Sequence, residues 1–238
     1  MHLLIPAAGM GKRMLHDRNK LLITLFGQPL LAWTLIAAEQ AASISWIGII
    51  GQPEDRSDLD TILGNISLSK PVQFIQGGKT RQESVYNGLQ GLPDSAERVL
   101  IHDGARCLAT PDLFDRCAAA IATCPGLIAA ISVKDTIKIV DNTGIIVDTP
   151  DRANLWAAQT PQGFDVKLLK ACHDKGRALG WEVTDDAALF EKCSLPVTIV
   201  PGEETNLKIT TPVDLAIAEF ILSNRKGVKP QSLKPSYP

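Results

Sequence analysis

The 238-residue chain lacks the sequence patterns of a metal site, a disulfide scaffold and a membrane span. Its five cysteines lie far apart, with no C-x-x-C pair and no histidine at metal-ligand spacing, so neither zinc nor disulfides are indicated. No apolar run approaches the ~18 residues of a membrane span, and no basic leader or transit segment precedes the first apolar run. We therefore expect a soluble, unexported protein with reduced cysteines in the cytoplasm. Removal of a transit peptide would place it in the plastid stroma instead.

The chain also lacks a strong excess of either charge. Its formal net charge is −2, which argues against a generic surface for nucleic acid or another polyanion. Affinity for phosphate must then come from a local cluster of cations, and that favours a small anionic ligand over nucleic acid or a membrane. The length, with 45% hydrophobic residues and no internal repeat, suits one domain with one substantial core.

Residues 3–14 form a short apolar run that breaks into a glycine-rich, basic loop, typical of a buried strand leading into a phosphate-binding turn. Two familiar phosphate loops are absent. A dinucleotide fingerprint needs glycine where Met14 stands, and a Walker A loop needs Ser or Thr where Arg13 stands. Small residues nevertheless let backbone N–H groups approach a polyphosphate, and cations stand nearby. The small residues are Ala7, Ala8, Gly9 and Gly11, and the cations are Lys12, Arg13 and Lys20.

Strand and helix patterns alternate along the chain. Apolar runs predict strands at 3–6, 44–50, 72–75, 99–101, 127–133 and 197–200, and helix formers predict helices at 29–42, 53–63, 81–92, 166–179 and 212–222. Because parallel strands joined by helices leave ligand sites outside their carboxyl ends, the motifs fall where a site would form. We predict an α/β fold, a single Rossmann-like domain over residues 1–224 with a mostly parallel twisted sheet flanked by helices. Residues 159–164 are expected to form a loop, and residues 225–238 a disordered tail.

Residues 136–148 break this alternation. Two short apolar segments surround Asn142-Thr143-Gly144, which predicts a β-hairpin within an arm over residues 134–153. Its apolar residues would be covered most simply by a two-fold partner, so a homodimer is one interpretation. A hairpin folded back on its own domain is the alternative.

Several segments in chain order carry a family resemblance. They are the 6–14 loop followed by Lys20, Gly78 with Arg81 and Ser84, Asp103-Gly104-Ala105-Arg106, Lys134-Asp135-Thr136, Asp151-Arg152, Thr160-Pro161-Gln162, Thr184-Asp185, and Asn206-Leu207-Lys208-Ile209-Thr210. Together, over most of residues 3–210, they resemble the 2-C-methyl-D-erythritol 4-phosphate cytidylyltransferase family of the non-mevalonate isoprenoid pathway. The resemblance implies a fold like that of nucleotide-diphospho-sugar transferases, with a protruding β-hairpin arm that forms a homodimer.

The resemblance also implies a role for each matched residue. Those implied to bind the nucleotide are Ala7, Ala8, Gly9, Gly11, Gly78, Ser84 and Asp103. Those implied to be catalytic cations are Arg13, Lys20, Arg152 and Lys208. Those implied to surround the acceptor are Arg106, Thr136, Thr160 and Thr184. Mg²⁺, or another divalent cation, would be held mainly by the CTP phosphates, with Asp103 as the candidate protein ligand.

The implied reaction transfers CMP from CTP to 2-C-methyl-D-erythritol 4-phosphate and releases pyrophosphate. The acceptor phosphate is already anionic, so no dedicated general base is required, and His102 beside Asp103 is interpreted as structural. Three alternatives stay open on the sequence. They are a ribitol 5-phosphate cytidylyltransferase, a sugar-phosphate nucleotidyltransferase that uses UTP or GTP, and a non-catalytic nucleotide-binding regulatory module.

Overall fold

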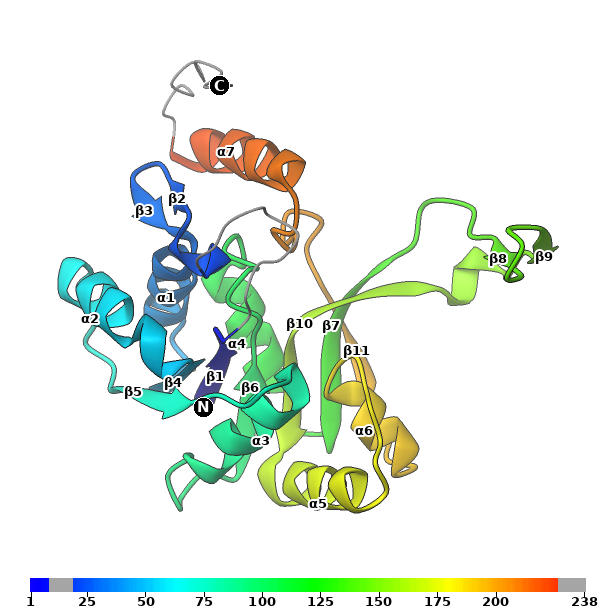
Figure 1. Ribbon diagram of the computed structural model, residues 1–238, viewed down its shortest axis with the longest axis horizontal. Coiled ribbons are helices and arrows are strands. Elements are labelled where there is room, and N and C mark those ends of the chain that lie inside the picture. Colours follow the sequence, from blue (N-terminus) through cyan, green and yellow to red (C-terminus); the bar gives the residue numbers. More distant parts are fainter. Residues whose placement is uncertain (9–18, 227–238) are drawn as a thin grey trace.

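Seven strands form one mixed sheet in the order β11-β7-β10-β6-β1-β4-β5 (Figure 1). The computed structural model describes residues 1–8 and 19–226. The strands are β1 (His2–Pro6), β4 (Trp46–Gly51), β5 (Val72–Gln76), β6 (Arg98–Ile101), β7 (Gly126–Ser132), β10 (Trp156–Asp165) and β11 (Thr198–Pro201). Every pairing is parallel except those of β10, which runs antiparallel to both β6 and β7. The predicted α/β fold with a mostly parallel sheet is therefore confirmed.

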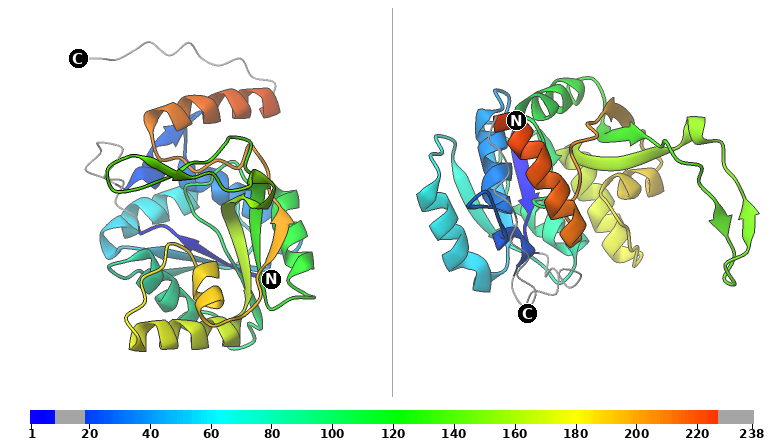
Figure 2. Two further views of the ribbon diagram at one scale, coloured as in Figure 1. Left: turned by 90° about the vertical axis from the view of Figure 1, so that its right-hand side faces the viewer. Right: turned by 90° about the horizontal axis from the view of Figure 1, so that it is seen from above.

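Helices cover both faces of this sheet (Figure 2). They are α1 (Leu30–Gln40), α2 (Arg56–Asn65), α3 (Arg81–Gln90), α4 (Pro111–Ala120), α5 (Val166–Ala178), α6 (Ala187–Lys192) and α7 (Pro212–Lys226). One apolar cluster joins α1, α2 and α4 to the sheet, and a second joins α3, α5 and α6 to its other face. Because β1 has helices on both sides, Leu3, Leu4 and Ile5 are all fully buried.

Short sequence signals set where the helices begin. The side chain of Thr80 accepts a hydrogen bond from the backbone N of Glu83 and so caps α3, and Thr110 caps α4 in the same way through Leu113. Asp165 caps α5. Pro111 stands at the first position of α4, where its missing N–H costs nothing. The sequence patterns thus predicted the starts of α3 and α5 to within a residue.

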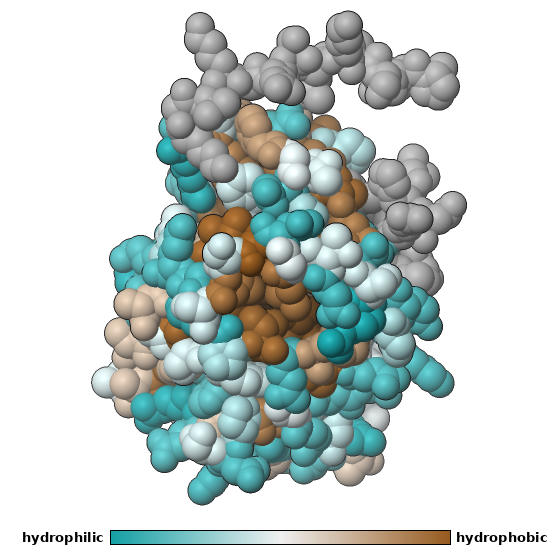
Figure 3. All heavy atoms as spheres, turned by 90° about the vertical axis from the view of Figure 1, so that its left-hand side faces the viewer, coloured by the Kyte–Doolittle hydropathy of each residue, from teal (hydrophilic) through white to brown (hydrophobic). Residues whose placement is uncertain are grey.

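A small hairpin, β2 (Thr24–Leu25) and β3 (Gln28–Pro29), was not predicted. Phe26 and Gly27 both have positive φ, 51° and 74°, which is the backbone conformation of a tight two-residue turn. Leu25 packs beneath α7 with Leu222 in a third apolar cluster. Figure 3 views the side that carries this hairpin and α2, and apolar side chains gather there in a hollow ringed by polar ones.

The prediction of a loop at residues 159–164 was wrong, because this segment is the middle of β10. Gln162 and Gly163 pair with β6 on one side and with β7 on the other. The ladder to β7 shifts register between Ala158 and Gln162, and Pro161 lies inside that irregularity. Proline is tolerated in a strand at such a bulge, so the Pro and Gly that suggested a loop occupy a central strand here.

The predicted hairpin is confirmed as β8 (Ile139–Val140) paired with β9 (Ile146–Asp148). In the turn, the Asp141 carboxylate accepts hydrogen bonds from the backbone N of Thr143 and of Ile145. Figures 1 and 2 show that the arm projects away from the domain, so it does not fold back on it. Its apolar side chains are between 47% and 64% exposed, namely Ile139, Val140, Ile145, Ile146 and Val147.

At the C-terminal end, α7 continues through Lys226. Arg225 donates hydrogen bonds to the carbonyl of Leu108 and the hydroxyl of Thr205, so residue 225, which was predicted to begin a disordered tail, belongs to this helix. Residues 227–238 lie outside the described part of the chain. Among residues 1–8 and 19–226, no helix has the length and apolar character needed to cross a bilayer.

The close approach of α3 to the sheet yields a stability prediction. A Cβ atom on Gly88 would lie 2.5 Å from Cδ1 of Ile50 and 3.2 Å from Cδ1 of Leu4, and both of these side chains are fully buried. We expect Gly88→Ala to lower the free energy of unfolding by about 1 to 2 kcal/mol, because overpacking outweighs the gain in helix propensity. Urea unfolding measures the change.

The matched control is Gly64→Ala in α2, where an added Cβ would meet nothing within 4 Å. That variant should be unchanged or more stable by up to about 1 kcal/mol. If Gly88→Ala were as stable as Gly64→Ala, α3 would not be packed against β4 as closely as described.

Candidate active site

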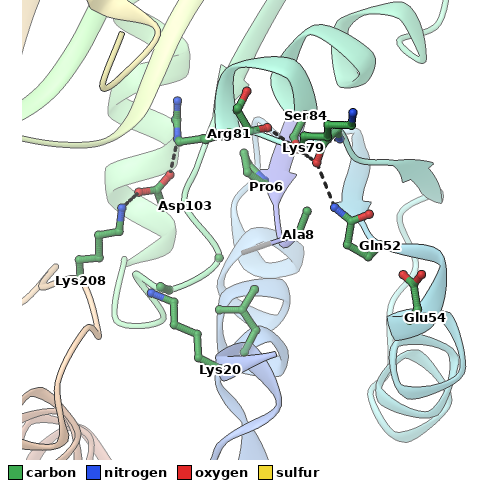
Figure 4. Close-up of a pocket in the computed structure, with 15 residues that line it drawn as sticks. Pro6, Ala8, Lys20, Gln52, Glu54, Lys79, Arg81, Ser84, Asp103 and Lys208 are labelled. Carbon is green, nitrogen blue, oxygen red and sulfur yellow. Dashed lines mark hydrogen bonds and ion pairs between the residues drawn. The ribbon is translucent and has the colours of Figure 1, made fainter. Parts of the chain in front are cut away.

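A cavity of about 600 Å³ opens at the carboxyl ends of β1, β4, β5 and β6 (Figure 4). Each of these parallel strands delivers a residue to it directly after the strand ends, which is where ligand sites form in such sheets. The lining residues include Ala8 after β1, Gln52 after β4, Gly78 after β5 and Asp103 after β6. Lys20 and Lys208 enter from two further segments. The structure therefore brings together six of the predicted site residues, which are Ala8, Lys20, Gly78, Ser84, Asp103 and Lys208.

Two cations form ion pairs with the carboxylate of Asp103. Nε of Arg81 lies 3.2 Å from Oδ1, and Nζ of Lys208 lies 2.6 Å from Oδ2. Burial by itself would raise the pKa of Asp103, but the positive charges of Arg81 and Lys208 outweigh it and hold that pKa well below its usual range. Asp103 is thus ionised at neutral pH, and it fixes the ends of two long cationic side chains at one wall of the cavity.

The opposite wall is a tight turn at Gly78. Its backbone N donates to Oγ of Ser84 at 3.0 Å, and its carbonyl accepts from Nε2 of Gln52 at 3.0 Å. The Ser84 hydroxyl donates in turn to the carbonyl of Thr80 at 2.8 Å. A Cβ on residue 78 would lie 2.3 Å from Cγ of Glu83, so only glycine fits this close approach. The turn is held rigidly, with its polar groups at the cavity edge.

Lys20 is the first residue of a short 3-10 helix, Lys20–Leu22. Its Nζ donates to the carbonyl of Ile209 at 3.0 Å, which joins Lys20 to the segment that carries Lys208. Asn19 fixes the position by donating to the carbonyl of Ala7 at 2.6 Å. Ala7 is buried, and its N donates to the carbonyl of Ile50, so it anchors the start of the loop. Gly9, Gly11 and Arg13 lie outside the described residues.

Arg106 and Thr160 lie behind the cavity wall. Arg106 donates to the carbonyls of Asn206 at 2.7 Å and Ala158 at 3.1 Å, and burial lowers its pKa. The hydroxyl of Thr160 accepts a hydrogen bond from the backbone N of Asp103 at 3.0 Å. Neither residue lines the cavity of this chain, so a direct contact of either with an acceptor stays a prediction.

His102 is fully buried beside these residues. Its Nδ1 lies 3.0 Å from Oγ1 of Thr160, and its Nε2 lies 3.1 Å from the carbonyl of Arg106. Desolvation lowers the pKa of His102 to about 4, so the ring is neutral at pH 7. A buried, neutral ring with both nitrogens in hydrogen bonds agrees with the structural interpretation of this histidine.

Three further predicted site residues, the catalytic candidate Arg152 and the acceptor candidates Thr136 and Thr184, are not brought to the cavity of their own chain. Thr136 and Arg152 are exposed on the arm, where Arg152 donates to the carbonyl of Lys134 at 3.1 Å. The arm extends away from the cavity (Figure 1). Thr184 is exposed just before α6 and is also outside the cavity lining.

The cavity offers little protein ligation for a metal ion. The residues that the structure describes contain no group of three or more His, Cys, Asp or Glu side chains that would hold one. Asp103 and Glu54 are the carboxylates that line the cavity, and each oxygen of Asp103 already contacts a cation. The donor set therefore suits an ion such as Mg²⁺ that takes its other ligands from phosphates and water, and does not suit an all-protein metal cage.

Comparison with known proteins identifies the family. The model of 2-C-methyl-D-erythritol 4-phosphate cytidylyltransferase matches residues 1–224. The chain is 73% identical to the protein of that name from Crocosphaera subtropica, over 94% of this chain and 99% of that protein. For the one from Microcystis aeruginosa the identity is 74%, over 94% and 100%. The crystal structure of 4-diphosphocytidyl-2C-methyl-D-erythritol synthase from Anaerococcus prevotii matches with a TM-score of 0.83 at 33% identity, over 93% and 97%. The chain belongs to the 2-C-methyl-D-erythritol 4-phosphate cytidylyltransferase family.

Several residues of this family member's cavity were missed by the sequence analysis. They are Gln52, Glu54, Lys79, Thr80 and Arg81. Gln52 directly follows the buried strand β4, and that position was a usable signal because ligand sites lie outside the carboxyl ends of parallel strands. Arg81 belongs to one of the segments that carry the family resemblance. No role was predicted for it, because nothing in the sequence shows that its guanidinium contacts Asp103.

The ion pairs of Asp103 yield a second stability prediction. Asp103→Asn should lower the free energy of unfolding at pH 7 by about 3 kcal/mol, because Arg81 and Lys208 lose the buried negative charge that they pair with. The pKa of this carboxyl is depressed in the folded state, so its contribution is fully present above the unfolded-state pKa of about 3.9 and is lost as pH falls toward the folded-state value. Urea unfolding at pH 7, 5 and 3 should show a constant difference between wild type and variant at pH 7 and 5, and a smaller one at pH 3.

The control for this experiment is Asp60→Asn, which removes an exposed pair with Arg56 at the surface of α2. Its cost should stay within about 0.5 kcal/mol. A difference for Asp103→Asn that is as large at pH 3 as at pH 7 would contradict the depressed pKa.

Proposed function

We infer that this chain is a cytidylyltransferase that transfers CMP from CTP to 2-C-methyl-D-erythritol 4-phosphate and releases pyrophosphate. The observation that carries this inference is the cavity of a member of this family, in which Lys20 and Lys208 converge on one side and the Gly78 turn lies on the other (Figure 4). Two cations facing a rigid turn of small residues suit a nucleotide with its phosphates at the cations and its base at the turn.

The base is proposed to be read at the Gly78 turn. Cytosine differs from uracil in its exocyclic amine and ring nitrogen, so a site must offer fixed partners to tell them apart. The Ser84 and Gln52 hydrogen bonds fix both backbone polar groups of Gly78. A carbonyl oxygen keeps a second lone pair, so the Gly78 carbonyl can accept from the cytosine amine while Gln52 still holds it.

The phosphates are proposed to lie between the loop after β1 and the lysines. The backbone of Ala7, Ala8, Gly9 and Gly11, with the charge of Arg13, would carry the triphosphate, and Lys20 and Lys208 would stand near the α-phosphorus. The acceptor phosphate attacks that phosphorus, and the developing negative charge is stabilised by these cations. An anionic nucleophile needs no proton removed, which agrees with the neutral, fully hydrogen-bonded His102.

A divalent ion, in our proposal Mg²⁺, would be bound mainly by CTP oxygens, with Asp103 as the protein carboxylate beside it. Bound there, it would neutralise phosphate charge. The cytoplasm, or the plastid stroma after removal of a transit peptide, is the proposed location, and the five cysteines, all free thiols, suit such a reducing compartment.

The acceptor half of the site is proposed to be completed by a second subunit. Thr136 and Arg152 lie on an arm that leaves its own domain and exposes several apolar side chains. A two-fold partner would cover those side chains and bring Thr136 and Arg152 of each arm to the other chain's cavity. Arg106, Thr160 and Thr184 would border the same acceptor, either directly or by holding the wall behind it.

The activity is tested by pyrophosphate release with four nucleoside triphosphates crossed with two acceptors, 2-C-methyl-D-erythritol 4-phosphate and ribitol 5-phosphate. We expect turnover with CTP and the methylerythritol phosphate, because the fixed Gly78 turn penalises a base that leaves its polar groups unpaired. Excess chelator should abolish the turnover if a divalent ion is required.

Each of the other outcomes of this assay would change the proposed function in a specific way. Preference for ribitol phosphate would replace the acceptor while keeping the reaction. Equal rates with UTP and CTP would remove the role given to Gly78 and Ser84. Binding of CTP without turnover of either acceptor would favour the regulatory module.

The shared site is tested by subunit complementation between inactive Arg152→Ala and inactive Lys20→Ala. If the two residues serve one site from different chains, a mixed dimer holds one site with both lesions and one with neither. Up to half of the wild-type activity per dimer should then return after subunit exchange, measured as pyrophosphate release.

Two results would count against the shared site. A mixture that has exchanged subunits and remains inactive would place Lys20 and Arg152 at the same chain's site. Full activity of a monomer, established by sedimentation at assay concentration, would remove the need for a partner. As a control, mixing two differently tagged Lys20→Ala proteins should restore nothing.

A further inference from the structure

Asp186 is a buried carboxylate behind the active site that none of the roles above uses. It directly precedes α6, and its side chain is only 1% exposed. Nη1 of Arg81 lies 2.8 Å from its Oδ2, and Nε2 of the fully buried His173 lies 3.7 Å from its Oδ1. Burial by itself would raise the pKa of Asp186, but the charge of Arg81 outweighs it, so the pKa is lowered. The carboxylate is therefore charged and faces the guanidinium.

Arg81 connects this buried carboxylate to the cavity. Its Nη1 faces Asp186, while its Nε faces Asp103 at 3.2 Å. A guanidinium is planar and its donors have fixed directions, so holding one edge sets the direction of the other. Asp103 then contacts Lys208 at 2.6 Å. The four side chains form a line of alternating charge from the interior to the cavity, in the order Asp186, Arg81, Asp103 and Lys208.

Asp186 is itself fixed to the sheet. Oε1 of Gln162, on β10, accepts hydrogen bonds from the backbone N of Asp186 and of Ala187, each at 3.2 Å. Nε2 of Gln162 donates to Oδ2 of Asp185 at 2.9 Å. Gln162 is 1% exposed and lies in the middle of a paired strand. The inner end of the line is thus tied to a central strand of the sheet, while its outer end is the half-exposed Lys208.

We propose that Asp186 is a positioning residue for the transfer reaction: by holding Arg81 from behind, it fixes Asp103 and, through Asp103, the ammonium of Lys208. The proposal rests on the proposed function, in which Lys208 stabilises charge at the α-phosphorus. Asp186 does not line the cavity. Its effect on catalysis therefore passes through Arg81, which does line it.

The effect of removing the charge of Asp186 follows from the alternation of negative and positive side chains along this line. With Asp186 neutral, the guanidinium is no longer shared between two carboxylates and turns toward Asp103 alone. A two-point contact of Arg81 with Asp103 competes directly with Lys208 for the carboxylate oxygens. Lys208 then loses its fixed partner. Since its charge is needed most in the transition state, kcat should fall more than the affinity for CTP.

The test is Asp186→Asn, which keeps the size and polarity of the side chain and removes its charge. We expect kcat to fall about 10²-fold, the size of effect that misplacement of a reacting group by about 1 Å produces, with the KM for CTP within about threefold of wild type. The matched control is Asp115→Asn. Asp115 accepts hydrogen bonds from the backbone N of Ala42 and of Ser43, outside the line of charges, so this variant should lower stability and leave kcat unchanged.

A double-mutant cycle separates positioning from a general structural effect. In a Lys208→Ala background the end of the line is already gone, so adding Asp186→Asn should lower kcat by less than about twofold. If the two losses multiply instead, or if Asp186→Asn retains wild-type kcat, the positioning role is overturned. Raised KM for CTP with unchanged kcat would overturn it as well.

A second variant covers the case in which Asp186→Asn does not fold. Arg81→Lys keeps the positive charge but has a single ammonium, which cannot hold two carboxylates in fixed directions. It should lose kcat to a similar extent, and a folded Arg81→Lys protein with wild-type kcat would overturn the proposal. Wild-type protein inactive with both acceptors would overturn the proposed function, and this inference with it. Active wild type with an equally active Asp186→Asn would overturn this inference alone.

Discussion

The buried charge of Asp103 is the constraint around which the cavity is built. A carboxylate removed from water is costly unless opposite charges and hydrogen bonds compensate it, and Arg81 and Lys208 do so from two different segments. The hydroxyl of Thr160, on a third segment, accepts a hydrogen bond from the backbone N of Asp103. The charged wall of the cavity therefore forms only where three segments meet at the end of β6. These segments are helix α3, strand β10 and the segment before α7.

The antiparallel strand β10 connects this centre to the rest of the molecule. Lying between β6 and β7, it places Thr160 beneath Asp103 and Gln162 beneath Asp186. Its other end forms one root of the arm, because Trp156 pairs with Ser132 of β7. One strand thus supports the charged wall of the cavity and carries the arm that leaves the domain.

The described cavity has the Gly78 turn on one side and cations on the other, but within one chain it lacks the arm residues of the proposed acceptor site. Thr136 and Arg152 stand on the arm beside exposed apolar side chains. Apolar surface held away from a finished domain is stable only when something covers it, and residues on the covering surface are then brought to a neighbour's site. A shared acceptor site would explain both features with one arrangement.

The alternation of strand and helix patterns was enough to predict the fold class. The family resemblance predicted Ala8, Gly78 and Asp103 as site residues, and their positions after parallel strands explain why they meet at one edge of the sheet. The hairpin of the arm followed from a local turn. Three features could be seen only in the folded chain. Residues 159–164 form a central strand, Thr160 and Arg106 support the cavity wall, and Arg81 bridges Asp103 and Asp186. These facts depend on contacts between residues far apart in the chain, such as Lys208 with Asp103 and Lys20 with Ile209. Local pattern and spacing carry no information about which distant partners will compensate a buried charge.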